Sequence, residues 1–429
     1  MTQSDGPYPI RPIGPEEFDA FRDVDVHAFG GTAMTEGERR LLLPGFEFDR
    51  TLAAMDGITP VGTAGAYTFQ LSVPGQQMLP AAGVSWVSVL PTHRRRGVLR
   101  SLMRRQLADV RDRGEPLAVL WASEAPIYGR YGYGCASWNA SFALRRGDGT
   151  LAAAAAAWDD GLRLRLRLAD PAAVLAELAK IYDAVLPSRP GFFARTEPWW
   201  QRLVYDPAEA RAAGTSPLRC LLAEDGSGPR GYALYSAVNR WDDAGLPDGE
   251  LTVRELMSAD PAAGAALWAD LLSRDLTSEF RPHQRPVDDP LLYQLADPRR
   301  ARPRVSDGLW ARITDVPAAL AGRRYSCPVD VVIEVRDDLM PQNAGRWLLT
   351  TTGSPDDADG TGLAASCAAT NAPAHLAVDV TQLGAAYLGG TRLGALAAAG
   401  LVAELRPGAV RRLSAAVAWD PAPWCPMIF

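Results

Sequence analysis

Lysine is almost missing from this 429-residue chain: it occurs once, at Lys180, and every other basic residue of the Lys/Arg pair is arginine. Long apolar stretches are also lacking, because no run approaches the ~20 residues that a membrane-spanning helix needs. The opening residues, MTQSDGPYPIRPIG, have neither the basic start nor the apolar core of a secretory signal. We therefore expect a cytoplasmic protein that does not enter a membrane.

Cysteine and histidine are few and widely scattered. The five cysteines include no Cys-x-x-Cys pair, and the four histidines show no spacing typical of a metal site. We expect reduced thiols and no bound metal ion. No cysteine has a neighbouring histidine that would activate it, so a covalent enzyme intermediate is not expected.

The charge balance excludes one broad class of partner. The net charge of −6 and the pI of about 5.4 argue against binding to nucleic acid and are compatible with a cationic small-molecule substrate. The length predicts two or three domains, because single hydrophobic cores stop growing at about 250–300 residues.

The most informative stretch joins a strand, a basic turn and a helix. A strand is predicted over 83–89, Pro91 breaks it, and Arg-Arg-Arg-Gly follows at 94–97. Apolar residues then recur at helical spacing over 98–107. Unpaired N–H groups and the helix dipole attract anions at a helix N-terminus, so this order predicts a phosphate-binding site. The alternative is a basic helix on the surface of an ordinary α/β domain.

The same stretch resembles the acetyl-CoA site of the GCN5-related N-acetyltransferases, whose pattern is Arg/Gln-x-x-Gly-x-Gly/Ala. Residues 94–97 fit, and Leu99 departs at the last position. The longer string VSVLPTHRRRGVLRSLM resembles the Eis (enhanced intracellular survival) family of actinobacterial acetyltransferases. This resemblance implies acetyl-CoA as the co-substrate. It implies that the cofactor-binding residues are Val87, Ser88 and Val89 along the pantetheine, Arg95, Arg96, Gly97, Val98, Leu99 and Arg100 at the pyrophosphate, and Ser123 and Glu124 near the thioester.

The chain divides into three parts, at 1–150, 151–300 and 301–429. A low-complexity stretch at 150–160 marks the first boundary, with an alanine-rich helix as the alternative. The second part repeats the strand-turn-helix plan over 251–272 without a basic glycine turn. The string DVTQLGAAYLGGTRLGALAAAGLV, from Asp379, resembles the C-terminal domain of the Eis family. The resulting fold class is mixed α/β: two tandem acetyltransferase-like domains, the second degenerate, followed by a sterol-carrier-like α+β domain.

Periodicity and turn residues predict the main elements. Helices are predicted to begin at Pro15, Val98, Asp170 and Asp260, and to cover 380–387 and 392–400. Strands are predicted at 8–12, 61–73, 83–89, 117–122, 135–145, 162–168, 218–222, 232–238, 251–257, 329–336, 345–352 and 374–380.

A segment rich in glycine and tyrosine, at 123–134, carries the candidate acid. When an amine attacks a thioester, the expelled thiolate needs a proton, and a tyrosine hydroxyl can supply it. Tyr128 stands at the acid position of the Eis family in the string SE-x-x-IYGR, and Tyr131 and Tyr133 are weaker candidates. In the alternative interpretation, all three tyrosines only pack and hydrogen-bond around a tight turn.

The C-terminal residues, PWCPMIF at 423–429, are unusually apolar, whereas chain ends are normally polar and frayed. The resemblance implies that Phe429 inserts into the acetyltransferase domain and that its α-carboxylate is the base for the amine. Ile428 stands where we expect an acidic residue in a relative that favours polycationic substrates. The acceptor class therefore stays open.

Acidic and aromatic side chains are candidates for binding the acceptor. Carboxylates hold ammonium groups, and aromatic rings offer cation–π faces. The candidates are Asp23, Asp25, Phe29, Trp86, Trp199 and Trp200. The two adjacent tryptophans are equally suited to anchoring a core or an interface.

Three kinds of acceptor fit these features: aminoglycoside-like polyamines, lysine side chains and small arylalkylamines. The resemblance also implies a homo-hexamer. Two other functions remain as alternatives: an acyl-CoA-binding sensor without catalysis, and a lipid carrier that uses the C-terminal domain.

Overall fold

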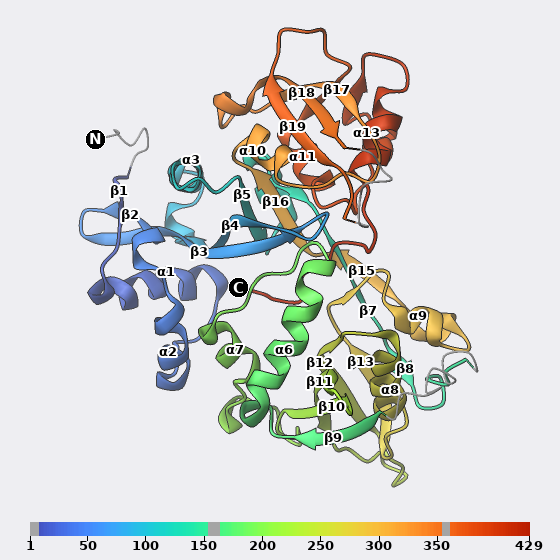
Figure 1. The fold of residues 1–429 in the computed structure, drawn as a ribbon. Coiled ribbons are helices and arrows are strands. Elements are labelled where there is room, and N and C mark those ends of the chain that lie inside the picture. The colour runs from blue at the N-terminus through green and yellow to red at the C-terminus, as the bar shows by residue number, and fades with distance from the viewer. Residues whose placement is uncertain (1–7, 153–163, 354–360) are drawn as a thin grey trace. The chain divides into compact units, whose positions relative to one another are not determined.

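The computed structural model describes residues 8–152, 164–353 and 361–429 (Figure 1). Most of the low-complexity stretch at 150–160 therefore lies outside the described residues. The chain forms two compact units, of which the first combines residues 1–137 with 308–429 and the second holds residues 138–307. Within the described ranges, no helix is both long enough and apolar enough to cross a membrane.

A seven-stranded sheet forms the base of the first unit. Its neighbours pair antiparallel except for one parallel pair in the middle, β4 with β5. The strand order is β1 (Ile10–Pro12), β2 (Leu52–Asp56), β3 (Thr59–Val73), β4 (Gln77–Val89), β5 (Leu117–Trp121), β16 (Leu309–Ile313) and β6 (Gly134–Cys135). Figure 1 shows β16 beside β5, so a strand from far along the chain completes the N-terminal sheet.

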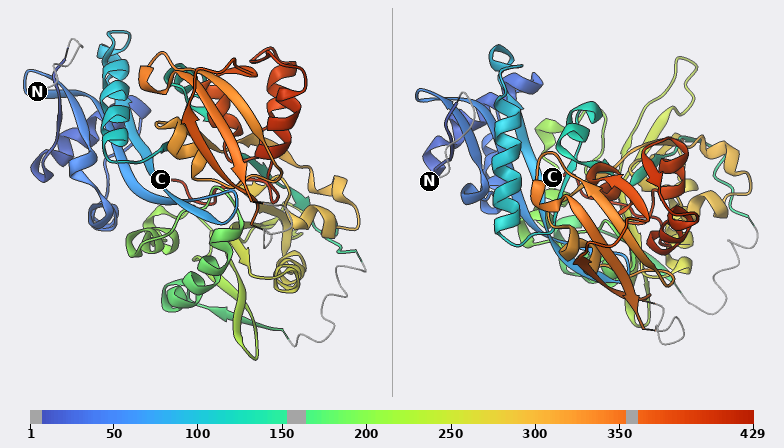
Figure 2. Two further views of the ribbon diagram at one scale, coloured as in Figure 1. Left: turned by 45° about the horizontal axis from the view of Figure 1, so that its top comes forward. Right: turned by 90° about the horizontal axis from the view of Figure 1, so that it is seen from above.

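Helices cover both faces of this sheet. On one face lies α3 (Val98–Asp112), which buries Leu102, Met103 and Leu107 completely and runs alongside the blue strands in Figure 2. On the other face lie α1 (Phe18–Phe29) and α2 (Glu36–Leu42). Successive strand residues point to opposite faces, so Ala54 packs with the α3 core while its neighbour Ala53 packs with the α1 core.

The parallel pair β4–β5 is short and opens into a fork. Its last paired residues are Gly83 and Val119, although β4 continues to Val89. Past the fork, Gly65 of β3 pairs with Ser85 of β4, and Thr63 pairs with Ser88, so β4 carries an extra residue. This is a β-bulge, and Trp86 within it has φ = +58°. The bulge and the fork expose one edge of β4 beyond Gly83.

The second unit contains a six-stranded sheet in the order β8-β13-β12-β11-β10-β9 and a three-stranded sheet in the order β14-β7-β15. Its main helices are α6 (Leu175–Val185), α7 (Glu197–Val204), α8 (Pro261–Leu272) and α9 (Pro290–Gln294). The strands are β7 (Trp138–Ser141), β8 (Leu144–Arg145), β9 (Arg165–Ala169), β10 (Arg219–Asp225), β11 (Gly228–Val238), β12 (Gly249–Ser258), β13 (Thr277–Pro282), β14 (Arg285–Pro286) and β15 (Arg304–Asp307).

The predicted Asp-Pro start of α8 is confirmed. The Asp260 carboxylate accepts a hydrogen bond from the Ala263 N–H group at 2.9 Å, as expected for a residue that caps a helix. Asp170 caps the short 3-10 helix Pro171–Val174, which leads into α6, in the same way, through the Ala172 N–H group at 3.1 Å.

The rest of the first unit is a C-terminal domain built on a five-stranded sheet in the order β19-β18-β17-β20-β21. Its strands are β17 (Asp330–Arg336), β18 (Gly345–Thr352), β19 (Ala364–Ala369), β20 (Leu376–Asp379) and β21 (Val402–Glu404). Its helices are α10 (Val316–Ala321), α11 (Val380–Ala386), α12 (Leu393–Ala398) and α13 (Ala409–Val417).

One sequence prediction is wrong: residues 135–145 do not form a single strand. They form β6, β7 and β8, which belong to three different sheets. The breaks have a physical cause, because the intervening N–H groups bond elsewhere: Ala136 donates to the Leu309 carbonyl and Phe142 to the Pro282 carbonyl. Several further elements were not predicted: strands β2, β13, β14, β15, β16, β19 and β21, and helices α2, α7, α9, α10 and α13.

Candidate active site

The basic turn leads directly into α3. Gly97 precedes the helix with φ = +83°, a backbone region that favours glycine, and a Cβ atom there would meet nothing within 4 Å. The first helical bond runs from the Ser101 N–H group to the Gly97 carbonyl, at 3.0 Å. Among the described residues, the N–H groups of Val98, Leu99 and Arg100 have no acceptor. These groups and the exposed Arg94–Arg96 give this helix start the geometry and charge to hold an anion.

The residues expected along the pantetheine lie past the fork of β4. Val87 and Val89 belong to the part of β4 that β5 no longer pairs with. The side chain of Ser88 is already engaged, because its hydroxyl donates to the Asp25 carboxylate at 2.8 Å. The side chains of Val87 and Val89 pack against the α3 core, so an incoming extended ligand would pair with the main chain of this stretch.

Tyr128 lies at the end of α4 (Ala125–Tyr128), just beyond β5. Glu124 stands at the N-cap position of this helix, and its side chain makes no capping hydrogen bond. The Ser123 side chain hydrogen-bonds to Tyr128. Burial raises the pKa of the Tyr128 hydroxyl to about 12, against a smaller opposing effect from Ser123. The phenol is therefore protonated at neutral pH, as a proton donor must be.

Tyr131 and Tyr133 are buried near Tyr128. The rings of Tyr128 and Tyr133 lie edge to face, with centroids 6.0 Å apart. Tyr133 is fully buried, and its hydroxyl has no hydrogen-bond partner in the part of the chain that the structure describes. Burial raises the pKa of both Tyr131 and Tyr133. Packing accounts for these two residues, whereas Tyr128 combines packing with a polar contact.

The end of the chain lies against β4. The Ser85 hydroxyl donates to the terminal oxygen of Phe429 at 3.1 Å, and the indole N–H of Trp121 donates to the Met427 carbonyl at 2.9 Å. The Phe429 ring packs against Phe69. The C-terminal carboxylate is thus held on the same sheet as the fork and the basic turn.

Two of the expected acceptor residues of the first unit, Asp25 and Trp86, already contact Arg22. Asp25 forms an ion pair with Arg22 in addition to its bond from Ser88. The Arg22 guanidinium lies 4.9 Å from the centre of the Trp86 ring, so this cation–π face is occupied. Asp23 and Phe29 are exposed.

The two tryptophans belong to the second unit. Trp199 and Trp200 lie on α7 and are buried there. The Trp200 ring lies edge to face against Tyr182 at 5.5 Å, and the Arg202 guanidinium lies 4.4 Å from the Trp199 ring. Their proposed role in acceptor binding stays a prediction.

Sequence reasoning missed Ser85, Trp121 and Arg22. The sequence could have indicated Trp121, because it lies at the carboxyl end of the predicted strand 117–122. Ligands in open α/β sheets bind beyond the carboxyl ends of strands. Ser85 and Arg22 had no such signal, because their roles depend on a bulge and a helix face that only the fold brings together.

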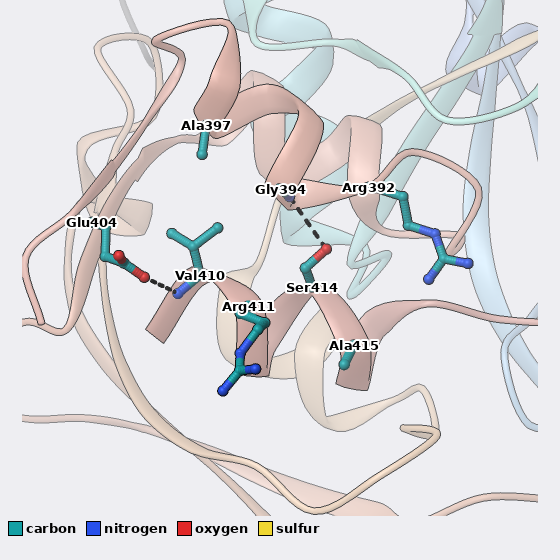
Figure 3. A pocket seen from close by; sticks show the side chains of 8 residues that line it. All are labelled: Arg392, Gly394, Ala397, Glu404, Val410, Arg411, Ser414 and Ala415. Carbon is teal, nitrogen blue, oxygen red and sulfur yellow. Dashed lines mark hydrogen bonds between the residues drawn. The ribbon is translucent and has the colours of Figure 1, made fainter. Parts of the chain in front are cut away.

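The C-terminal domain contains an open pocket of about 440 Å³ between α12, β21 and α13 (Figure 3). Its polar groups bond to one another: Glu404 accepts from the Val410 N–H group at 3.0 Å, and Ser414 accepts from the Gly394 N–H group at 3.2 Å. Arg392 and Arg411 stand on its exposed walls. A lipid tunnel encloses its ligand, whereas this pocket is open to solvent, so it does not support the lipid-carrier alternative.

In the described ranges, no group of three His, Cys, Asp or Glu side chains is placed so that it could hold a metal ion.

Comparison with known proteins defines the class. Residues 9–136 and 191–313 match family models described as acetyltransferase (GNAT) domains, and residues 316–426 match a model of the sterol carrier protein domain. The fold is therefore that of two GCN5-related acetyltransferase domains followed by a sterol-carrier-like domain, which confirms the predicted fold class.

Full-length relatives narrow the class to one family. The chain is 43% identical over 417 residues to an uncharacterized N-acetyltransferase of Streptomyces avermitilis, which covers 97% of this chain and 98% of the relative. It is 36% identical over 414 residues to the N-acetyltransferase Eis of Mycobacterium tuberculosis, with 95% and 91% covered. The crystal structure of Eis1 from Mycobacterium abscessus matches with a TM-score of 0.81 at 33% identity, over 98% of this chain and 100% of that one. The chain belongs to the Eis family of N-acetyltransferases.

Proposed function

We propose that this enzyme transfers an acetyl group from acetyl-CoA directly to a primary amine of a small cationic acceptor, within a ternary complex. One observation carries the proposal. The N-terminus of α3, the Tyr128 hydroxyl and the Phe429 carboxylate all belong to the first unit, around one forked sheet.

The co-substrate would bind in three sections. Residues 95–100 would hold the pyrophosphate through helix N–H groups and arginine charge. The main chain of Val87–Val89 would pair with the pantetheine arm as an added strand. Ser123 and Glu124 would lie near the thioester.

Two groups of the chain would move protons. The Phe429 carboxylate would accept a proton from the ammonium of the acceptor, directly or through a water, and free the amine to attack the thioester carbonyl. Tyr128 would hydrogen-bond through its hydroxyl to the sulfur as the carbon–sulfur bond breaks, and the second proton, which the nitrogen loses as the amide forms, would pass to the departing thiolate or to solvent. A phenol with a pKa of about 12 is a weaker acid than a thiol with a pKa of about 8.5, so Tyr128 acts largely as a hydrogen-bond donor to the departing sulfur.

The acceptor is proposed as a class: aminoglycoside-like amines, lysine side chains or arylalkylamines, contacted by Asp23, Asp25, Phe29, Trp86, Trp199 and Trp200. Support comes from the acidic net charge and from the exposed carboxylate of Asp23. For the acceptor to bind at Asp25 and Trp86, it would have to replace Arg22 in the ion pair with Asp25 and on the face of the Trp86 ring.

A thiol-release assay with acetyl-CoA and a panel of these amines tests the function. Turnover with at least one amine is expected. Burial raises the pKa of the Cys220 and Cys367 thiols to about 12 and keeps these two of the five cysteines unreactive, and a blank without amine corrects for the other three. Binding of acetyl-CoA without thiol release for any amine would instead favour a sensor.

We also propose the assembly and organisation that the family resemblance implies. The acetyl-CoA-binding domain spans 1–150, the degenerate domain 151–300 and the sterol-carrier-like domain 301–429, in a cytoplasmic homo-hexamer. Light scattering that reports a monomer at micromolar concentration would refute the hexamer.

A further inference from the structure

Two side chains at the open end of the β4–β5 fork contact the last three residues of the chain. The Ser85 hydroxyl donates to the terminal oxygen of Phe429 at 3.1 Å. The Trp121 indole N–H donates to the Met427 carbonyl at 2.9 Å. One contact comes from each strand of the fork, so the C-terminal segment bridges the two strands.

The positions of these two residues follow from the register. Gly83 and Val119 are the last pair of the parallel ladder, and Ser85 and Trp121 each lie two residues beyond it. Side chains two residues apart on a strand point to the same face. Val84 and Leu120 pack into the α3 core, so Ser85 and Trp121 point to the opposite face of the sheet.

The contacts of the Phe429 ring hold the residue but not its carboxylate. The ring packs against Phe69, and it lies close to Gly83, where an added Cβ atom would come within 3.1 Å of the ring. Rotation about the last Cα–C bond still moves the carboxylate oxygens while the ring stays in place. The Ser85 hydroxyl, in contrast, bonds to a terminal oxygen directly.

Met427, two residues before the chain end, is held from the other strand of the fork, β5. Trp121 fixes the Met427 carbonyl, to which the Cys425 thiol also donates at 3.2 Å. Ile428, between the two anchored residues, has a side chain that is 57% exposed and anchors nothing by burial. The position of the carboxylate therefore depends on hydrogen bonds at Met427 and Phe429.

We infer that Ser85 and Trp121 are positioning residues that set the place and direction of the C-terminal carboxylate for amine deprotonation, an assignment that rests on the proposed acetyltransferase function. Neither side chain takes up a proton in the reaction. Each acts through Phe429, and a displacement of about 1 Å at a reacting group is enough to cost about 10²-fold in rate.

Single variants give the first part of the test. Ser85→Ala should lower kcat by about 10–10²-fold with little change in the Kd of acetyl-CoA, and Ser85→Thr, which keeps a hydroxyl, should recover most of the rate. Trp121→Phe should lower kcat in the same direction, because it keeps the ring and loses the donor. Trp347→Phe is its matched control, since the Trp347 indole donates to the Asn343 carbonyl at 2.9 Å within the C-terminal domain.

A double-variant cycle gives the decisive part. Appending one glycine after Phe429 moves the carboxylate away, so in that background Ser85→Ala should have almost no further effect on kcat. Full additivity of the two changes, or a rate for Ser85→Thr as low as that for Ser85→Ala, would overturn the inference while leaving the enzyme an acetyltransferase. An unmodified enzyme that releases no thiol with any amine would overturn the proposed function, and this inference with it.

Discussion

Phe69 and Phe429, 360 positions apart in the sequence, pack edge to face with ring centroids 5.1 Å apart and ring planes inclined at 70°. An aromatic pair of this geometry adds about 0.5–1.5 kcal/mol beyond its buried area. The contact draws the end of the chain onto the central strands of the acetyltransferase sheet.

The first prediction concerns this end. One glycine appended after Phe429, or a C-terminal His tag, should lower kcat by about 10²–10⁴-fold, because that is the usual contribution of a general base. The thermal unfolding midpoint and the Kd of acetyl-CoA should change little. Steady-state kinetics and calorimetry measure these quantities, and the same tag at the N-terminus is the control. Full activity with a C-terminal tag would show that Phe429 only packs.

The second prediction concerns the basic turn. Gly97→Val should weaken acetyl-CoA binding, because a side chain at this position intrudes on the pyrophosphate and strains a backbone with φ = +83°. Gly114→Val is a matched control at the far end of α3, with φ = +74° and equally open surroundings. Both variants should lose similar stability, of about 1–2 kcal/mol, while only Gly97→Val loses affinity by calorimetry. Arg95→Ala should also weaken binding. Unchanged affinity in Gly97→Val and Arg95→Ala would rule out this turn as the cofactor site.

The third prediction separates two neighbouring tyrosines. Tyr128→Phe should lower kcat by about 10²–10⁴-fold and leave the Kd of acetyl-CoA nearly intact. Tyr133→Phe should preserve activity and leave stability equal or slightly higher, because the Tyr133 hydroxyl is buried without a partner among the described residues, and such a group costs about 1–3 kcal/mol. A large loss of kcat in Tyr133→Phe would transfer the acid role to that residue.

The fourth prediction concerns a buried ion pair. The Arg312 guanidinium, on β16, donates to both carboxylate oxygens of Asp337 at 2.8 and 2.7 Å, and both side chains are almost fully buried. Arg312→Met should lower the free energy of unfolding by about 3–5 kcal/mol, since it leaves a buried charge unpaired. Arg346→Met removes an exposed pair with Glu334 and should cost about 0–1 kcal/mol. Denaturant titrations compare the two, and equal losses would contradict the argument.

The fifth prediction concerns alkaline pH. Burial raises the pKa of the Tyr128 hydroxyl to about 12, and it raises the pKa of Tyr325 and Tyr387 as well, against the opposing charge of Arg323. The unfolded phenols ionise near pH 10, so the stability held by the neutral folded forms is complete below pH 10 and falls between about pH 10 and 12. Urea midpoints measured at pH 8, 10 and 11 should decline only above pH 10. Midpoints that are flat from pH 8 to 11 would contradict this assignment.

The sequence predicted elements whose signals are local. The alternation and breakers around Gly83–Val89, the periodicity of α3 and the Asp260-Pro261 start of α8 each depend on a few neighbouring residues, and each is confirmed. Strand β18 agrees with its predicted bounds, 345–352, because glycine opens an uninterrupted run of strand formers.

Elements that depend on distant partners escaped prediction. Strand β2, with Ala53 and Ala54 at its centre, has a weak strand propensity and exists because β1 and β3 flank it. The break of 135–145 into three strands depends on carbonyls of residues 282 and 309. In the site, motif residues were predictable, whereas the partnership of Ser85 with the chain end was not.

The position of β16 late in the sequence affects the order in which the protein folds during synthesis. A ribosome synthesises from the N-terminus, and domains usually fold in that order, at about 5–20 residues per second. Strands β5 and β6 are synthesised early, but β16, which lies between them in the sheet, follows residues 138–307 in the chain. At these rates β16 is synthesised roughly 10–30 s after β6, and only then can the N-terminal sheet be completed. The second unit can fold during that interval. On the proposed mechanism activity also needs Phe429, which is translated more than 100 residues after β16.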